Sequence, residues 1–276
     1  LADGCEQGTF VLRLTRPDGT SRTWWKLRPD ENALNDSALE LVLPEAAELS
    51  DLTYWLLAPT RLPSLWTGDQ ITVQAVYDYF NGTTVVQLER NGYQEPLQIP
   101  KASHEVLDRA LTTAVEEGTL WLLSGPASLL HEPVPAGVLT AQANLCTPPA
   151  VFAAAEILPQ NLETAWKDNV ASALSVATAL SLKAGKTLPW KTVREVLNAA
   201  LHARFVELES ASNSWPCDFS AAKFAAFKVS EQSGSGTGSG FSGASGAGES
   251  GRHKVLIANS PMEASQIQDF GDALPK

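Results

Sequence analysis

The sequence has no long apolar run and few of the residues that hold small secreted proteins together. No stretch of 18 apolar residues occurs in the 276 residues, and the first residues lack the basic and apolar regions of a secretion signal. The three cysteines, Cys5, Cys146 and Cys217, lie far apart, which favours free thiols in a reducing compartment. We therefore expect a cytoplasmic protein that makes no membrane contact.

Positive charge is also scarce. Twenty Lys and Arg stand against 31 Asp and Glu, which gives a net charge of −11 and a pI of about 4.8. Phosphate contacts need a surplus of Lys and Arg, so this balance excludes a general polyanion-binding surface and leaves room only for a local basic patch. Since the sequence starts without Met and ends on Leu274-Pro275-Lys276, we expect a fragment of a longer protein.

No catalytic signature is complete in the sequence. Gly185-Lys186-Thr187 resembles the end of a phosphate-binding loop, but Leu180 stands where the first glycine belongs, so Gly185 is predicted to end a helix. His104-Glu105 begins a zinc-binding helix pattern whose second histidine position holds Asp108. The four histidines are scattered and suggest no nucleophile–base pair. We expect no catalytic, cofactor or metal site in this chain, and hence no enzyme activity.

One pattern occurs three times in the chain. The strings Glu6 to Leu12, Glu116 to Leu122 and His202 to Leu208 each look like a helix end that continues directly into a strand. They predict an α+β fold of tandem winged-helix-like units, in which helices are followed by short antiparallel wing hairpins. The predicted organisation is a truncated wing hairpin at 1–28, a connector at 29–66, winged-helix-like units at 67–137 and 138–230, a flexible Gly/Ser linker at 231–252 and the start of a further domain at 253–276.

Local patterns place the elements of these units. The turn Arg16-Pro17-Asp18-Gly19 predicts a hairpin of 10–15 and 21–27, in which only one of Trp24 and Trp25 faces inward, so the other must meet a neighbouring unit or water. Apolar spacing predicts helices near 69–80, after Ser103, after Asp168 and from Pro189 onward. The remaining tryptophans are predicted to pack in cores and between units.

The helix that begins near Pro189 carries the sharpest functional hypothesis. Between Lys183 and Phe205 there are five Lys or Arg and only one acidic residue, Glu195. A helix of this kind can enter the major groove of duplex DNA, but the same cations could instead complement an acidic neighbouring unit. The candidate nucleic-acid-binding residues are Lys183, Lys186, Lys191, Arg194, Asn198 and His202, of which the last four are spaced to share one helix face.

Several strings together are similar to a known family. They are Gly8-Thr-Phe-Val-Leu-Arg-Leu, Val42-Leu-Pro-Glu-Ala-Ala-Glu-Leu, Gly118-Thr-Leu-Trp-Leu-Leu-Ser-Gly-Pro and Pro189-Trp-Lys-Thr-Val-Arg-Glu-Val-Leu. The sequence resembles the C-terminal part of large AAA-type P-loop ATPases of unknown function from prokaryotic phage-defence and DNA-modification gene neighbourhoods. The resemblance implies that ATP binds upstream of this region, and that its partners are other domains of the ATPase or a defence-system protein. We therefore expect a non-catalytic interaction and scaffold region, with DNA binding near 189–203 as the alternative.

Overall fold

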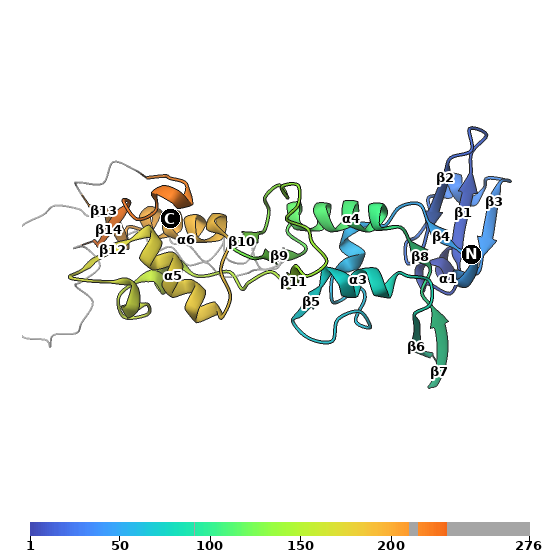
Figure 1. Cartoon of the computed structure of the whole chain (residues 1–276), viewed down its shortest axis with the longest axis horizontal. Helices are drawn as coiled ribbons and strands as arrows, with labels where there is room; N and C mark the ends of the chain where they lie inside the picture. Colours follow the sequence, from blue (N-terminus) through green and yellow to red (C-terminus); the bar gives the residue numbers. More distant parts are fainter. Residues whose placement is uncertain (91, 210–214, 231–276) are drawn as a thin grey trace, which may run out of the picture. The chain divides into compact units, whose positions relative to one another are not determined.

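The computed structural model describes residues 1–90, 92–209 and 215–230, and these combine helices with small antiparallel sheets (Figure 1). The predicted α+β class is confirmed at this level. By their contacts all of these residues fall within one unit, residues 1–235. The predicted linker at 231–252 and the predicted further domain at 253–276 lie outside the described residues.

The first repeat is a helix end followed by a three-stranded sheet in the order β2-β1-β3. Its elements are α1 (Ala2–Glu6), β1 (Val11–Thr15), β2 (Ser21–Trp24), α2 (Glu31–Leu34) and β3 (Leu39–Val42). The hairpin of β1 and β2 lies where its turn sequence predicts it. β3 lies inside the segment predicted to be a connector, but it pairs antiparallel with β1 and sets Leu41 opposite Leu12. The first sheet therefore takes in part of 29–66.

The second repeat carries a four-stranded sheet in the order β10-β9-β11-β5. The chain enters it through η1 (Pro44–Ala46), β4 (Glu48–Leu49) and η2 (Tyr54–Leu57). Its other elements are β5 (Gln70–Thr72), α3 (Val73–Tyr79), β6 (Val85–Arg90), β7 (Tyr93–Gln98), β8 (Lys101–Ala102), α4 (His104–Glu116), β9 (Trp121–Ser124), β10 (Ala127–Leu129) and β11 (Asn144–Cys146). β4 and β8 form a short parallel pair, and the hairpin of β6 and β7 projects away from the helices (Figure 1).

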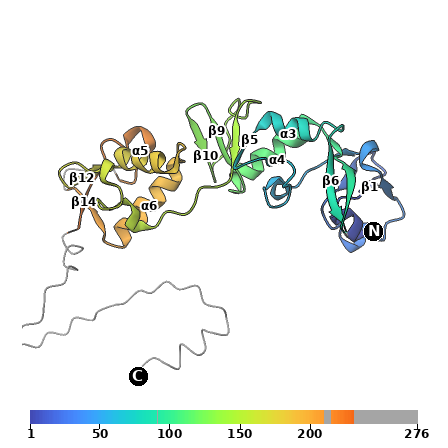
Figure 2. The same cartoon turned by 90° about the horizontal axis from the view of Figure 1, so that it is seen from below.

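The third repeat packs two helices against a three-stranded sheet in the order β12-β14-β13 (Figure 2). Its elements are η3 (Ala154–Ile157), η4 (Glu163–Ala165), β12 (Val170–Ser172), α5 (Ala173–Ala184), α6 (Trp190–His202), β13 (Val206–Leu208), η5 (Phe219–Ala221) and β14 (Ala226–Val229). Gly185 ends α5 in the left-handed conformation at φ +70°, as its position after the apolar stripe predicts.

Two predicted helix starts are wrong for the same reason. Helix α3 begins at Val73 rather than near Asp69, and α5 begins at Ala173 rather than after Asp168. The residues in front of each helix form the short strands β5 and β12, which pair with β11 and β14, the last strands of their repeats. The helices are capped by the hydroxyls of Thr72 and Ser172. These accept hydrogen bonds from the backbone N–H groups of Ala75 and Ser175, at 3.1 and 3.0 Å. The pairing of β11 with β5 and β9 also places Asn144–Cys146 with the second sheet, beyond residue 137.

Matching hydrogen bonds identify the second and third repeats as copies of one arrangement. The indole N–H of Trp66 donates to the carbonyl of Leu57 at 2.9 Å, and that of Trp166 donates to the carbonyl of Ile157 at 2.7 Å. The first helix of each repeat is joined to the last strand in the same way, because Val73 N–H donates to Ala143 and Ala173 N–H to Ala225. The two repeats therefore share one order of elements: a short strand, two helices, and further strands that pair with the first strand in one sheet.

The helix ends extend this equivalence to the first repeat. In each copy the helix terminates at a residue with positive φ, namely Gly8 at +79°, Gly118 at +73° and Arg204 at +56°. The next residue then donates its N–H to a carbonyl five positions back, from Thr9 to Gly4, Thr119 to Ala114 and Phe205 to Ala200. The first repeat therefore corresponds to the second half of the other two, from the last turn of the second helix onward.

The sheets of the first two repeats bury apolar residues on both faces. Leu12 and Trp24 lie in a small core of the first repeat. Their chain neighbours on the other face, Val11 and Trp25, belong to the core of the second repeat. Trp25 meets Phe80 edge to face with ring centroids 5.8 Å apart. We call the face that packs on a repeat's own core its inner face and the opposite one its outer face.

Candidate nucleic-acid interface

Helix α6 is amphipathic, as its apolar spacing predicts. Val193, Val196, Leu197 and Ala200 are buried in the core of the third repeat. The opposite side carries the four predicted residues, and the structure brings Lys191, Arg194, Asn198 and His202 onto one helix surface. The neighbours of these side chains decide what this surface can bind.

Lys191 and Arg194 lie near the segment that follows β10, which contains Glu132. The Nζ of Lys191 donates to the backbone carbonyl of His131 at 3.1 Å. Burial raises the pKa of the adjacent Glu132 carboxyl, and the positive charges of Lys191 and Arg194 act against that rise. The positive charges of Lys191 and Arg194 therefore offset only part of the cost of burying this acid of the second repeat.

Asn198 is held by the loop that precedes β14. Its side-chain carbonyl accepts a hydrogen bond from the indole N–H of Trp215 at 2.9 Å. Trp215 in turn lies edge to face with Trp190 and with Phe227, at centroid distances of 6.2 and 5.2 Å. His202 lies in the last turn of α6 and is exposed. Of the four residues on this surface, Asn198 is the one that an aromatic cluster of the same repeat fixes in place.

Lys183 and Lys186 lie at the end of α5 and not on the α6 surface. Lys183 forms an ion pair with Glu156 at 2.8 Å, within the third repeat. Lys186 forms an ion pair with Asp69 of the second repeat at 2.6 Å, and this bond lowers the pKa of the Asp69 carboxyl. Both cations are therefore engaged by carboxylates of the chain, one of them across the boundary between repeats.

The outer face of the second sheet packs against the core of the third repeat. Trp121, Leu130 and Cys146 are buried and belong to the core that contains α5 and α6. The indole N–H of Trp121 donates to Oγ of Ser128 at 2.9 Å, and Ser128 donates to the carbonyl of Thr187 at 2.6 Å. The sequence predicts Trp121 to be one of the tryptophans that pack in cores and between units, but it does not identify the third repeat as the unit that Trp121 contacts.

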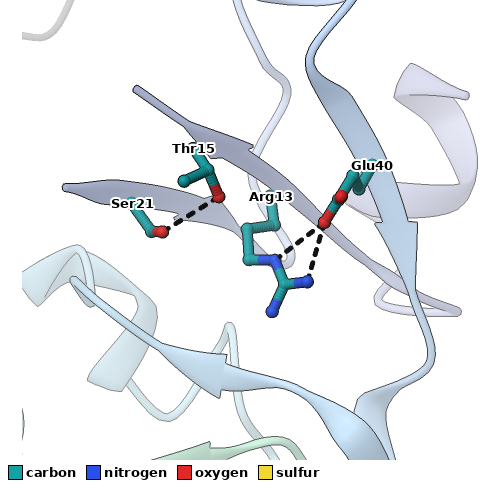
Figure 3. Close-up of polar contacts among 4 residues, drawn as sticks. All are labelled: Arg13, Thr15, Ser21 and Glu40. Carbon is teal, nitrogen blue, oxygen red and sulfur yellow. Dashed lines mark hydrogen bonds and ion pairs between the residues drawn. The ribbon is translucent and has the colours of Figure 1, made fainter. Parts of the chain in front are cut away.

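The outer face of the first sheet is apolar where Val11 and Val42 contact the second repeat, and it becomes polar further along the strands. Figure 3 shows Arg13 on β1 reaching across to Glu40 on β3, with the closest nitrogen and oxygen 2.7 Å apart. One step further along the strand, the hydroxyls of Thr15 and Ser21 are 3.1 Å apart. These cross-strand polar pairs mark where the apolar contact of Val11 and Val42 with the second repeat ends.

The remaining candidate motifs have other surroundings. The ring of His104 stacks on Tyr77 with centroids 4.1 Å apart, and Asp108 accepts a hydrogen bond from the Tyr77 hydroxyl at 2.5 Å. Within the described ranges, no group of three or more His, Cys, Asp or Glu is arranged to hold a metal ion. None of the helices described is both long and apolar enough to cross a bilayer.

Comparisons with protein-family models, with curated proteins and with solved structures found no match for this chain.

Proposed function

We propose that this chain is a non-catalytic interaction and scaffold region, in which tandem winged-helix-like units dock against one another and against other proteins. The observation that carries the proposal is the burial of Trp121, which leaves 2 % of its surface exposed and lies in the core of the following repeat. Large aromatic side chains are typical anchors of such contacts. The first and second repeats each use the outer face of their sheet to hold the next.

The winged-helix assignment is supported by the order of elements in the third repeat. Two helices, α5 and α6, are followed by the antiparallel strands β13 and β14, and β12 completes the sheet. In such units the second helix is the one that enters DNA. Here the surface of α6 that would face DNA is hydrogen-bonded to His131 and Trp215, which favours a structural use of the helix.

The proposed parent protein is a large cytoplasmic ATPase of a phage-defence or DNA-modification system. This part of the proposal rests on the resemblance of the sequence, since function does not follow from a fold alone. The ATP-binding motor would lie upstream, and this region would present its repeats to other domains of the ATPase or to a second defence protein.

A binding titration with fluorescent duplex DNA at low salt tests the proposal against its alternative. For a scaffold region we expect no saturable binding by the chain. The variant Lys191→Ala with Arg194→Ala is instead expected to speed amide exchange in residues 130–133, because it removes the cations that face this segment. Lys223→Ala with Lys228→Ala removes the same charge elsewhere in the third repeat and should leave 130–133 unchanged.

DNA binding through α6 is the alternative, favoured by the local surplus of cations between Lys183 and Phe205. It predicts saturable binding that is weakened by Lys191→Ala with Arg194→Ala and kept by the Lys223 and Lys228 control. Loss of one phosphate contact lowers the slope of log affinity against log salt by about one, whereas Asn198→Ala would relax sequence preference. That pattern of results would replace the scaffold proposal.

A further inference from the structure

The first sheet leaves an apolar residue exposed at a position that both other copies bury completely. Leu41 on β3 lies opposite Leu12, as Leu145 lies opposite Leu122 and Phe227 opposite Leu208. Leu145 and Phe227 are 0 % exposed, whereas Leu41 keeps 50 % of its surface exposed. The same strand position is therefore covered in two repeats and open in the first.

The neighbouring inner-face positions follow the same trend. Phe10 is half-buried, whereas its counterparts Leu120 and Val206 are 0 and 1 % exposed. Leu39 is also half-buried, although its counterparts are the buried residues Ala143 and Ala225. The exposure is thus shared by three positions of the inner face and not confined to one leucine, although Leu12 and Trp24 on the same face are buried.

A strand and a helix provide the cover in the complete repeats. β5 pairs with the free side of β11, and β12 pairs in the same way with β14. Each of these strands leads directly into a helix, α3 or α5, that packs over the inner face. Among the described residues, β3 pairs only with β1, so its other edge has no such strand.

We propose that the open edge of β3, together with Phe10, Leu39 and Leu41, is a docking surface for a short β-strand followed by an amphipathic helix. The occupant is an element of the kind that β5–α3 and β12–α5 supply within their own repeats. The strand contributes backbone hydrogen bonds along the edge, and the apolar side of the helix covers Leu41. This inference is independent of the scaffold proposal, because it concerns how the first repeat is completed and not what the array then binds.

A second copy of the chain is a poor occupant on physical grounds. Its own elements of this type are buried, since Ala171 and Val176 are 1 and 0 % exposed and Ile71 and Val76 are 7 and 1 % exposed. A second copy would have to open one of its repeats in order to lend them. A strand–helix element that is not already part of a complete repeat has no such cost.

Grafting tests the surface directly. The helix-end equivalence places Leu1 at the position of Leu197, so residues 154–196 of this chain are added in front of Leu1 to supply the elements that precede this position in the third repeat. Amide exchange at Leu39–Val42 is expected to slow by at least about tenfold relative to the unextended chain. The matched control carries Val176→Asp and Leu180→Asp in the grafted copy and should give no slowing. Unchanged exchange at β3, or equal slowing by the control, would overturn the proposal.

A second pair of variants keeps the proposal testable if the graft does not fold. In the unextended chain, Leu41→Asp should keep Tm within about 2 °C and reduce the fluorescence of a bound apolar dye, whereas Leu145→Asp should lower Tm by about 10 °C or more. A large loss of Tm with Leu41→Asp, or unchanged dye binding, contradicts an open apolar surface. If sedimentation instead shows a dimer that Leu41→Asp dissociates, a second copy is the occupant and the proposal is wrong.

Discussion

Replacing Trp121 by alanine should loosen the third repeat more than the second repeat to which Trp121 belongs. The side chain is 2 % exposed and lies in the core formed by α5 and α6. Its indole N–H also begins the short chain of hydrogen bonds through Ser128 to the Thr187 carbonyl. Removing it therefore takes away both apolar packing and a polar link between the two repeats.

The size of the effect follows from the burial. Replacing a buried tryptophan by alanine costs about 3–5 kcal/mol, which corresponds to a change of about a hundredfold or more in the opening equilibrium. The matched variant is Leu122→Ala, one residue along β9, because Leu122 is 0 % exposed on the inner face of the same strand. Its loss of about 2–5 kcal/mol should fall on the second repeat.

Amide exchange read peptide by peptide distinguishes the two variants, because it reports local opening separately in the second and the third repeat. We expect Trp121→Ala to speed exchange in α5 and α6, and Leu122→Ala to speed it in α3 and α4. If Trp121→Ala speeds exchange only in the second repeat, or by less than about fivefold in α6, the outer face does not anchor the third repeat and the scaffold reasoning is refuted.

Three further perturbations follow from the geometry. Gly118→Ala should destabilise the chain more than Gly185→Ala in thermal unfolding. Both glycines have a positive φ, a conformation that costs a residue with a side chain about 1–2 kcal/mol. At position 118 the new Cβ would in addition overlap the ring of His131, whereas nothing lies within 4 Å of it at position 185. Glu132→Gln should stabilise the chain at pH 7, because burial raises the folded-state pKa of Glu132 and an acid with a raised pKa weakens folding when it is ionised. The difference should close as pH falls through the raised folded-state pKa and should be gone by about pH 4, where the acid is mostly protonated in both states. A constant difference across pH would contradict this. Glu207→Trp with Lys228→Val should make the chain associate at higher concentration in sedimentation runs, whereas Glu207→Gln with Lys228→Gln should not, and equal behaviour of the two would refute an apolar cause.

The longer elements of the fold could be predicted from the sequence because each carries its own signal. The turn around Pro17 and Gly19 gives the first hairpin, and the apolar stripes give α4 and α6 with bounds close to those observed. The cap at Ser103 and the helix end at Gly185 follow from local chemistry that tertiary contacts do not override.

The short strands could not be predicted in this way. β5, β11 and β12 have three residues each, which is too few to display a two-residue alternation, and their conformation depends on partners distant in the sequence. The sequence-based prediction of the interface lacked the neighbours of its residues for a related reason. The positions of Lys191 and Asn198 on α6 are a matter of helix geometry, but their bonds to His131 and Trp215 depend on how the chain folds back on that helix.

One cross-strand pair on the outer face accounts for where docking between repeats continues and where it stops. In the first repeat this pair is Val11 and Val42, in the second it is Trp121 and Cys146, and both pack into the following core. In the third repeat the equivalent pair is Glu207 and Lys228, which form an ion pair at 3.1 Å with about half of each side chain exposed. Covering this pair with another repeat would take two charges out of water, a cost that their mutual attraction repays only with further hydrogen bonds. A polar outer face is typical of capping repeats, so at this strand position the third sheet lacks the apolar anchor that Trp121 supplies in the second.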